Sequence, residues 1–143
     1  IMTLRESINR KIRNLKDAKT KIPVLVSNNS KNFFLQSFRN QGFTDNSLEK
    51  WQKRDNRARR SSGRAILVDT GALRRSIKVS QSSFNKIVIT SNLPYAAVHN
   101  YGLKAGRGRG FKMPKRKFMG NSKKLNQQNI DIIKSELTKI FKA

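Results

Sequence analysis

His99 is the single histidine of a chain that contains no cysteine, so few of its side chains are suited to catalysis. A histidine that acts as a general base needs a substrate or nucleophile within reach, and usually a carboxylate that orients its ring. No acidic residue lies near His99 in the sequence, and only Ser91 and Asp69 are candidate neighbours in space. Tyr95 lies four residues before His99, a spacing that places both side chains on one side of a short helical turn. We therefore interpret His99 as a packing or hydrogen-bonding residue and expect no catalytic residues.

The rest of the composition also argues against an enzyme. The absence of cysteine excludes disulfide bonds, thiolate metal ligands and a cysteine nucleophile. The eight acidic residues are scattered over 143 positions, so we expect neither a paired-carboxylate site nor a metal site, and no cofactor. No apolar run approaches the roughly 18–20 residues needed to cross a bilayer, so we expect no membrane partner. Glu6 and the lack of an apolar core in the first 15 residues argue against a secretory leader.

Charge is the most unusual property of the chain: 32 Lys and Arg face 8 Asp and Glu, for a formal net charge of +24. Self-repulsion of this size opposes compaction, so we expect a polyanionic partner, either nucleic acid or an acidic protein surface. Many of the cations fall in two segments, 53–64 and 104–117. In the second segment arginines alternate with glycines, which predicts a mobile loop that adapts to phosphates or carboxylates. It lacks the G-x-x-x-x-G-K-[ST] frame of a phosphate-binding loop.

Nine residues of these two segments are our candidates for contact with DNA or with an acidic partner. They are Arg57, Arg59, Arg60, Arg107, Arg109, Lys112, Lys115, Arg116 and Lys117.

Apolar residues at three- and four-residue steps from Leu4 to Ile22 predict an amphipathic N-terminal helix. Pro23 is expected to interrupt it, because proline lacks a backbone donor and its ring clashes with the preceding turn. A second helical stretch should end at Gly42. Its apolar residues are Val26, Phe33, Phe34 and Phe38. Residues 44–64 show no period and predict an irregular loop, in which Trp51 is tied to the core.

Period-2 patterns around 77–79 and 86–90, separated by a polar turn at 82–85, predict an antiparallel hairpin. Before it, Asp69 or Thr70 is expected to cap a short helix. A last strand is expected at 111–113, before Pro114. The C-terminal helix should begin after Asn121 or Ser122. Its apolar residues should share one face: Leu125, Ile130, Ile133, Leu137, Ile140 and Phe141.

Helices, strands and a final helix in this order indicate an α+β fold. We expect N-terminal helices and a C-terminal helix packed on a small antiparallel sheet, with long basic loops. The length suits a single domain, 1–143, with a helical part at 1–42, a sheet and signature region at 66–120 and the C-terminal helix at 121–143.

Several short motifs occur in a recognisable order between the tryptophan and the C-terminal helix. After Trp51 comes a turn motif formed by Thr70, Gly71, Leu73, Arg74, Ser76 and Ile77. After the hairpin come Tyr95, Ala96, His99 and Gly102, and then Pro114, Arg116, Phe118 and Gly120. Together they resemble the phage virion-morphogenesis family of small tail-completion and head–tail joining proteins. Segment 104–112 departs from the family, because it is more basic and richer in glycine.

The resemblance implies a non-enzymatic phage structural protein: a subunit of a ring at the head–tail junction or tail end, found in the virion tail or neck and assembled in the host cytoplasm. Its partners would be copies of itself and other neck, connector or tail proteins, with genomic DNA in the lumen as a further candidate. Trp51 and Phe118 are candidate interface anchors, because aromatic residues dominate interface hot spots. The residues expected to specify the fold are Thr70, Gly71, Leu73, Ile77, Tyr95, His99, Gly102 and Pro114. A free-standing basic nucleic-acid-binding protein is the alternative, since a pI near 11.5 is typical of that class.

Overall fold

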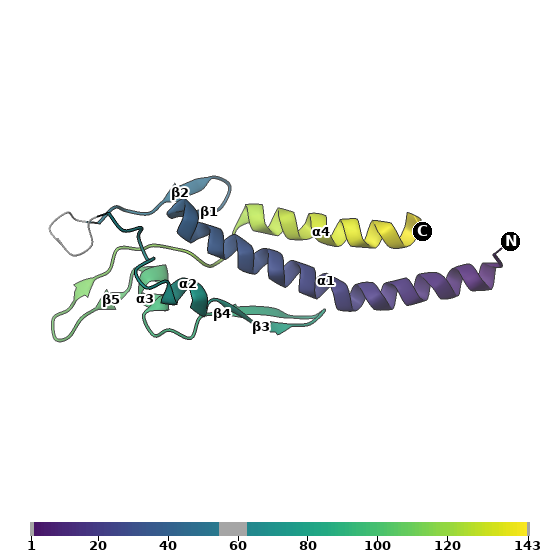
Figure 1. Cartoon of the computed structure of the whole chain (residues 1–143), viewed down its shortest axis with the longest axis horizontal. Helices are drawn as coiled ribbons and strands as arrows, with labels where there is room; N and C mark the ends of the chain where they lie inside the picture. Colours follow the sequence, from purple (N-terminus) through teal and green to yellow (C-terminus); the bar gives the residue numbers. More distant parts are fainter. Residues whose placement is uncertain (1, 55–62, 143) are drawn as a thin grey trace.

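The structure is a computed structural model that describes residues 2–54 and 63–142. Its dominant element is a single helix, α1 (Leu4–Asn40), which runs along the length of the molecule (Figure 1). Thr3 caps it in a capping box: its hydroxyl accepts the Glu6 N–H at 3.3 Å, and the Glu6 carboxylate accepts the Thr3 N–H at 2.8 Å. These two reciprocal bonds satisfy donors that a helix N-terminus otherwise leaves unpaired.

The predicted break at Pro23 is wrong, because α1 continues through it. Proline inside a helix destabilises the helix by about 3 kcal/mol. Pro23, however, lies in a stretch of α1 that packs against other parts of the chain on two of its sides. The buried Pro23 has the buried neighbours Ile22 and Val26, which pack against Ile140 of the C-terminal helix. The helix ends at Asn40, and Gln41 takes the left-handed conformation at its C-terminus.

Gly42 is therefore not the helix stop but the first residue of a strand. Strands β1 (Gly42–Thr44) and β2 (Leu48–Lys50) form an antiparallel hairpin where the sequence predicted an irregular loop. A side chain at Gly42 would overlap the carbonyl oxygen of Glu49 on the paired strand. Trp51 follows β2 directly, and its backbone N–H donates to the Gln41 carbonyl at 2.8 Å. The hairpin thus returns the tryptophan to the end of α1.

The second hairpin confirms the sequence prediction. After the short helix α2 (Ala72–Ser76), β3 (Lys78–Ser82) pairs antiparallel with β4 (Ile87–Thr90). The short helix α3 (Ala96–Tyr101) and a third hairpin follow, formed by β5 (Lys104–Ala105) and β6 (Phe111–Lys112). The α+β class is confirmed, but the described strands make three separate two-stranded sheets instead of one small sheet.

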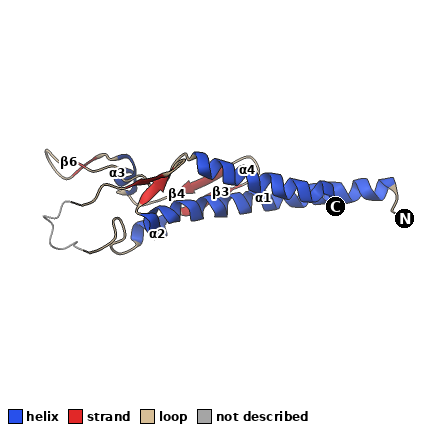
Figure 2. Ribbon diagram, turned by 90° about the horizontal axis from the view of Figure 1, so that it is seen from above, coloured by secondary structure: helices blue, strands red, loops and turns tan. Residues whose placement is uncertain are grey.

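The molecule is elongated, with α1 between two flanking elements (Figures 1 and 2). The C-terminal helix α4 (Lys123–Lys142) lies along one side of α1 and runs antiparallel to it, and the β3–β4 hairpin lies along the other. A main core gathers at the C-terminal end of α1, around Phe38, Phe43 and Phe118. A second, smaller core joins α1 to α4 through Ala18, Ile22, Val26 and Ile140. None of the described helices is long and apolar enough to cross a membrane.

The cap of α4 agrees with the prediction, but its buried face does not. The Ser122 hydroxyl accepts the Leu125 N–H at 3.1 Å, as an N-cap should. The buried residues of α4 are Leu125, Glu136 and Ile140, with Asn129 and Ile132 half-buried. Four of the six residues expected to form its apolar face are exposed: Ile130, Ile133, Leu137 and Phe141. The more apolar face of α4 is therefore turned away from α1.

Candidate functional site

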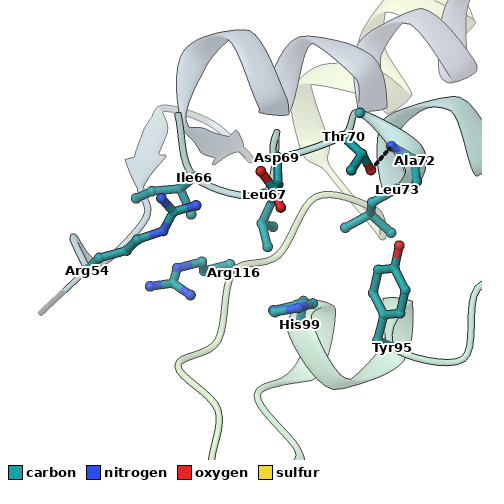
Figure 3. A pocket seen from close by; sticks show the side chains of 11 residues that line it. Arg54, Ile66, Leu67, Asp69, Thr70, Ala72, Leu73, Tyr95, His99 and Arg116 are labelled. Carbon is teal, nitrogen blue, oxygen red and sulfur yellow. Dashed lines mark hydrogen bonds between the residues drawn. The ribbon is translucent and has the colours of Figure 1, made fainter. Parts of the chain in front are cut away.

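Three segments that are far apart in the sequence meet around one pocket of about 300 Å³ at the end of the molecule that holds the main core (Figure 3). The first is the loop that leads into α2, the second is α3, and the third is the chain after β6. The pocket is lined by Arg54, Ile66, Leu67, Asp69, Thr70, Gly71, Ala72, Leu73, Tyr95, His99 and Arg116. Six of these residues belong to the signature motifs, so we call it the signature pocket.

The loop before α2 forms one wall. Gly71 adopts a φ of +74°, a left-handed conformation that side chains rarely take, and it is buried. The predicted cap by Asp69 or Thr70 is wrong, because the N-cap of α2 is Gly71, which makes no side-chain cap bond. The Thr70 hydroxyl instead accepts the Ala72 N–H at 3.3 Å, as Figure 3 shows. Leu73 and Ile77 then enter the core, with 4% and 1% exposure. The turn therefore places Leu73 and Ile77 in the core, and its backbone conformation depends on Gly71.

The short helix α3 forms the opposite wall. Tyr95 and His99 lie edge to face, with ring centroids 6.1 Å apart, as their spacing predicted. Gly102 ends α3 with a φ of +68° and donates its N–H to the Val98 carbonyl. A Cβ at Gly102 would lie 2.9–3.0 Å from Lys115 atoms, two of them in the backbone. The glycine is therefore needed both for its conformation and for the close approach of the third segment.

A network of hydrogen bonds holds that third segment in place. The Arg116 N–H donates to the His99 carbonyl at 2.8 Å. The buried Asn100 accepts the N–H groups of Phe118 and Met119 at 2.8 and 3.0 Å, and donates to the Met119 carbonyl at 3.1 Å. Trp51 donates its indole N–H to the Lys117 carbonyl at 2.7 Å. Residues 116–119 are thus bound to α3 and to the core on both sides.

The pocket has a positive and partly desolvated character. Arg116 is only 7% exposed, and its Nε and Nη2 each lie 3.3 Å from the Gln52 carbonyl. Burial lowers the pKa of Arg116, and the nearby Arg54 lowers it further. Burial also lowers the pKa of His99, with a second contribution from Arg116. Both effects favour the neutral imidazole. The buried Nδ1 of His99 has no hydrogen-bond partner in the described part of the chain.

This arrangement does not orient a general base. Asp69 lines the same pocket, but its carboxylate pairs with the Arg64 guanidinium. Ser91, the other candidate neighbour of His99, is hydrogen-bonded to the Ser76 hydroxyl at 2.6 Å. The pocket is a concave site with apolar walls and a buried positive charge. Those properties suit the fold, or the docking of another chain, better than acid–base chemistry.

The candidate contact residues divide into three groups. Arg107, Arg109, Lys112 and Lys115 are exposed, the first three on the β5–β6 hairpin or its turn. Arg116 and Lys117 are engaged within the chain: Lys117 lies over the Phe43 ring and donates to the Asn121 carbonyl at 3.0 Å. Arg57, Arg59 and Arg60 lie outside the described residues. The β5–β6 segment, expected as a mobile loop, is a hairpin whose turn contains three glycines at positive φ.

The expectation that Trp51 and Phe118 are interface anchors needs correction. Trp51 is 7% and Phe118 1% exposed, and both pack on Phe38, with ring centroids 5.8 and 5.3 Å away. Their apolar surface is already buried in the chain's own core, so it is not available to a partner.

Sequence reasoning missed the polar residues that bind the segments together. Asn100 is one, and Gln41 is another: its side chain donates to the Phe38 and Ile66 carbonyls and accepts the Ile66 N–H. Ser37 is a third, since its hydroxyl donates to the Phe118 carbonyl at 3.3 Å. The only signal for Asn100 was its position inside the second motif, beside His99.

Comparison with known proteins shows the family to which the chain belongs. The phage virion morphogenesis family matches residues 3–138, which is nearly the whole chain, so the chain belongs to that family. By that family's description, its members serve the morphogenesis of phage virions. Over 53 residues it is 47% identical to the Mu-like prophage FluMu G protein 2 of Haemophilus influenzae. That match covers 37% of this chain and 38% of the relative's length. No solved structure matches the chain.

Proposed function

We propose that the chain is a non-enzymatic subunit of a homo-oligomeric ring at the head–tail junction or tail end, acting in tail completion or as a connector. In this proposal its basic surfaces face DNA in the lumen or acidic faces of neighbouring neck, connector or tail proteins. The β5–β6 hairpin is the observation that carries the proposal. It projects from the body at the end of the molecule opposite the N-terminus (Figures 1 and 2).

The hairpin carries positive charge, and residues 104–112 contain no acidic residue that would compensate it. Lys104 and Lys112 are directly opposite each other in the register, and both are exposed. Like charges in that position destabilise a strand pair. Arg107 and Arg109 extend the same charge to the turn between the strands. The facing positive charges destabilise the free hairpin, and a partner that supplies negative charge would remove this repulsion.

A ring strengthens this argument, because it brings several hairpins together. Each copy has a net charge of +24, so a closed ring of copies requires a polyanion to relieve the repulsion. Genomic DNA in the lumen, or acidic neighbouring rings, would provide it. The family membership supports this setting, since virion morphogenesis proteins act in the assembly of phage particles.

The signature pocket supports a structural role over a catalytic one. Its motif residues hold α2, α3 and the segment 116–119 together, and Asp69 pairs with Arg64 instead of orienting His99. We propose that the motif maintains the base of the β5–β6 hairpin, because Gly102 and Lys115 lie just before and just after it and are in close contact. The pocket then fixes the direction in which the basic hairpin points.

The second candidate is a free-standing basic nucleic-acid-binding protein, which the net charge favours. Particle size and binding of the purified protein, after nuclease treatment, separate the two. The ring proposal predicts assembly into rings visible in negative stain, alone or with the phage's tail and connector proteins. A chain that stays monomeric with all of those proteins, yet binds duplex DNA tightly with a steep salt dependence, would contradict it.

Arg107→Ser with Arg109→Ser sharpens the test, and Lys78→Ser with Lys86→Ser is the matched control. Both double variants remove two exposed positive charges from a hairpin, but the control pair lies on β3 and beside β4. The proposal expects the hairpin variant to lose binding to its anionic partner, and the control to lose much less. Equal losses would show that net charge alone, and not the β5–β6 hairpin, governs binding.

A further inference from the structure

The first turns of α1 carry an apolar stripe that the described part of the chain leaves uncovered. Leu4, Ile8, Ile12 and Leu15 are 79%, 48%, 44% and 42% exposed. Their spacings of four, four and three residues place them on one side of the helix. Figure 1 shows that these turns extend past the C-terminal end of α4. We call residues 4–15 the α1 overhang.

The stripe continues a contact that already exists inside the molecule. Along α1 the next apolar residues of the row, Ala18, Ile22 and Val26, are buried and pack with Ile140 of α4. Lys21 and Glu136 form an ion pair at 2.9 Å along the same contact. The overhang therefore presents the kind of surface that α4 covers further along the helix.

A second uncovered stripe lies on α4. Ile130, Ile133, Leu137 and Phe141 are 44%, 36%, 36% and 63% exposed, whereas the face toward α1 includes Asn129 and Glu136. A helix normally buries its more apolar face. The outward position of this stripe indicates a surface that another polypeptide covers.

The two stripes match in length and in spacing. Leu4 and Leu15 are eleven positions apart, and so are Ile130 and Phe141. The steps are four, four and three along α1, and three, four and four along α4. Read backwards, the α4 steps become four, four and three. In an antiparallel pair of helices the stripes therefore align in register, with Leu4 beside Phe141, Ile8 beside Leu137, Ile12 beside Ile133 and Leu15 beside Ile130.

We propose that the α1 overhang of one copy packs antiparallel on the outer face of α4 of the next copy. This inference rests on the ring proposal and names its subunit contact. The overhang points away from the body (Figures 1 and 2), so it cannot fold back on the outer face of its own α4. Each copy thus donates one stripe and accepts another, and such heterologous contacts form a ring when the rotation between neighbouring copies closes.

This contact has a salt dependence that differs from that of the basic hairpin. Exposed cations lie beside both stripes, for example Arg5, Arg13 and Lys134. Copies with a charge of +24 repel one another at low ionic strength, and added salt screens that repulsion while it leaves apolar burial intact. Self-association should therefore strengthen with salt, whereas the binding of polyanions should weaken.

The cysteine-free sequence allows a direct test by disulfide cross-linking between two single-cysteine variants. The Ile12→Cys and Ile133→Cys variants are mixed at high salt, which favours self-association, and are then oxidised. A disulfide between them reports proximity, because it forms only when the two Cα atoms come within about 7 Å. We expect a covalent dimer between the two variants, and another between Ile8→Cys and Leu137→Cys. The pair Ile8→Cys with Ile130→Cys is out of register and should give far less. All of these positions are exposed, so the fold should tolerate the changes.

A companion variant tests assembly without oxidation. Ile12→Lys places a charge in the stripe, and Val24→Lys places the same charge on α1 at an exposed position off the stripe. Sedimentation should show lost self-association for the first variant and normal behaviour for the second. Equal behaviour of the two would contradict the inference.

Three outcomes of the cross-linking overturn the contact: no dimer in either in-register pair, equal yields in and out of register, or efficient dimers of Ile12→Cys with itself. The last would indicate two overhangs packed together. Electron microscopy of the same samples separates this failure from that of the ring proposal. Rings without the in-register cross-links would leave the ring standing with a different contact, whereas the absence of both rings and cross-links would contradict both.

Discussion

The Arg116 backbone N–H donates to the His99 carbonyl oxygen at 2.8 Å, and this bond joins two signature segments that a projecting hairpin separates. His99 lies in α3, before the β5–β6 hairpin, and Arg116 lies after it. The bond therefore closes the base of the hairpin. Gly102 is also in contact with Lys115, and Asn100 is bonded to residues 118 and 119, so the motifs on either side of the basic hairpin are held together in space.

Replacement of Asn100 should destabilise the chain strongly. Asn100→Ala leaves the N–H groups of Phe118 and Met119 without their acceptor in a buried region, at a cost of about 2–4 kcal/mol for the two groups together. Asn92→Ala, at an exposed position, is the control and should stay within about 0.5 kcal/mol of the wild type. Urea unfolding measures both. Similar midpoints for the two variants would rule out a structural role for the Asn100 bonds.

Gly102→Ala should destabilise the fold through its positive φ and through the close approach of Lys115. The variant Gly108→Ala separates these two effects. Gly102 and Gly108 both have positive φ values, +68° and +61°, but only at Gly102 would a Cβ meet other atoms within 4 Å. Each alanine should cost about 1 kcal/mol in backbone strain, and the close approach to Lys115 should make Gly102→Ala the costlier. Thermal unfolding gives the comparison. If Gly108→Ala proves at least as damaging, the packing of Gly102 against the third segment is not what requires a glycine.

The pocket predicts a specific pH dependence of stability. The pKa of His99 is lowered in the folded state by burial and by Arg116, so the unfolded chain binds more protons between that pKa and the ordinary histidine pKa of 6.5. Stability should therefore be complete above pH 6.5 and decline as the pH falls through this window. His99→Gln should remove this component of the slope.

Because His99 is the single histidine, NMR of its imidazole reads the titration without overlap from other histidines. Urea unfolding of the wild type and of His99→Gln, measured across the same pH range, supplies the slope. A midpoint for His99 at or above 6.5 in the folded protein would contradict the desolvated pocket.

Replacement of Lys104 and Lys112 by threonine should change stability and partner binding in opposite directions. Removal of two facing positive charges should raise stability by about 0.2–1 kcal/mol. The same change should weaken the binding of the anionic partner, measured by co-sedimentation with the purified tail and connector proteins or with duplex DNA. A loss of stability together with unchanged binding would show that the lysines serve the hairpin and not a partner.

The elements that sequence reasoning predicted well are those set by local chemistry. The β3–β4 hairpin followed from alternation and a polar turn. The α4 cap was expected at Asn121 or Ser122, and Ser122 provides it. Pro23 was misjudged because tertiary packing on both sides of α1 outweighs the loss of one hydrogen bond. The buried face of α4 was misjudged because periodicity shows which residues are apolar, but not whether their partner lies in the same chain. Asn100 was missed because its bonds reach residues 18 and 19 positions away.

The location of the chain in purified phage particles tests the central claim most directly. Particles of the phage that encodes it would be treated with nuclease and purified, then analysed by quantitative mass spectrometry and electron microscopy. We predict several copies per particle, located together at the head–tail junction or at the tail end. Absence of the chain from particles, together with its recovery on free nucleic acid in the lysate, would contradict a structural role in the neck or tail and favour the nucleic-acid-binding alternative.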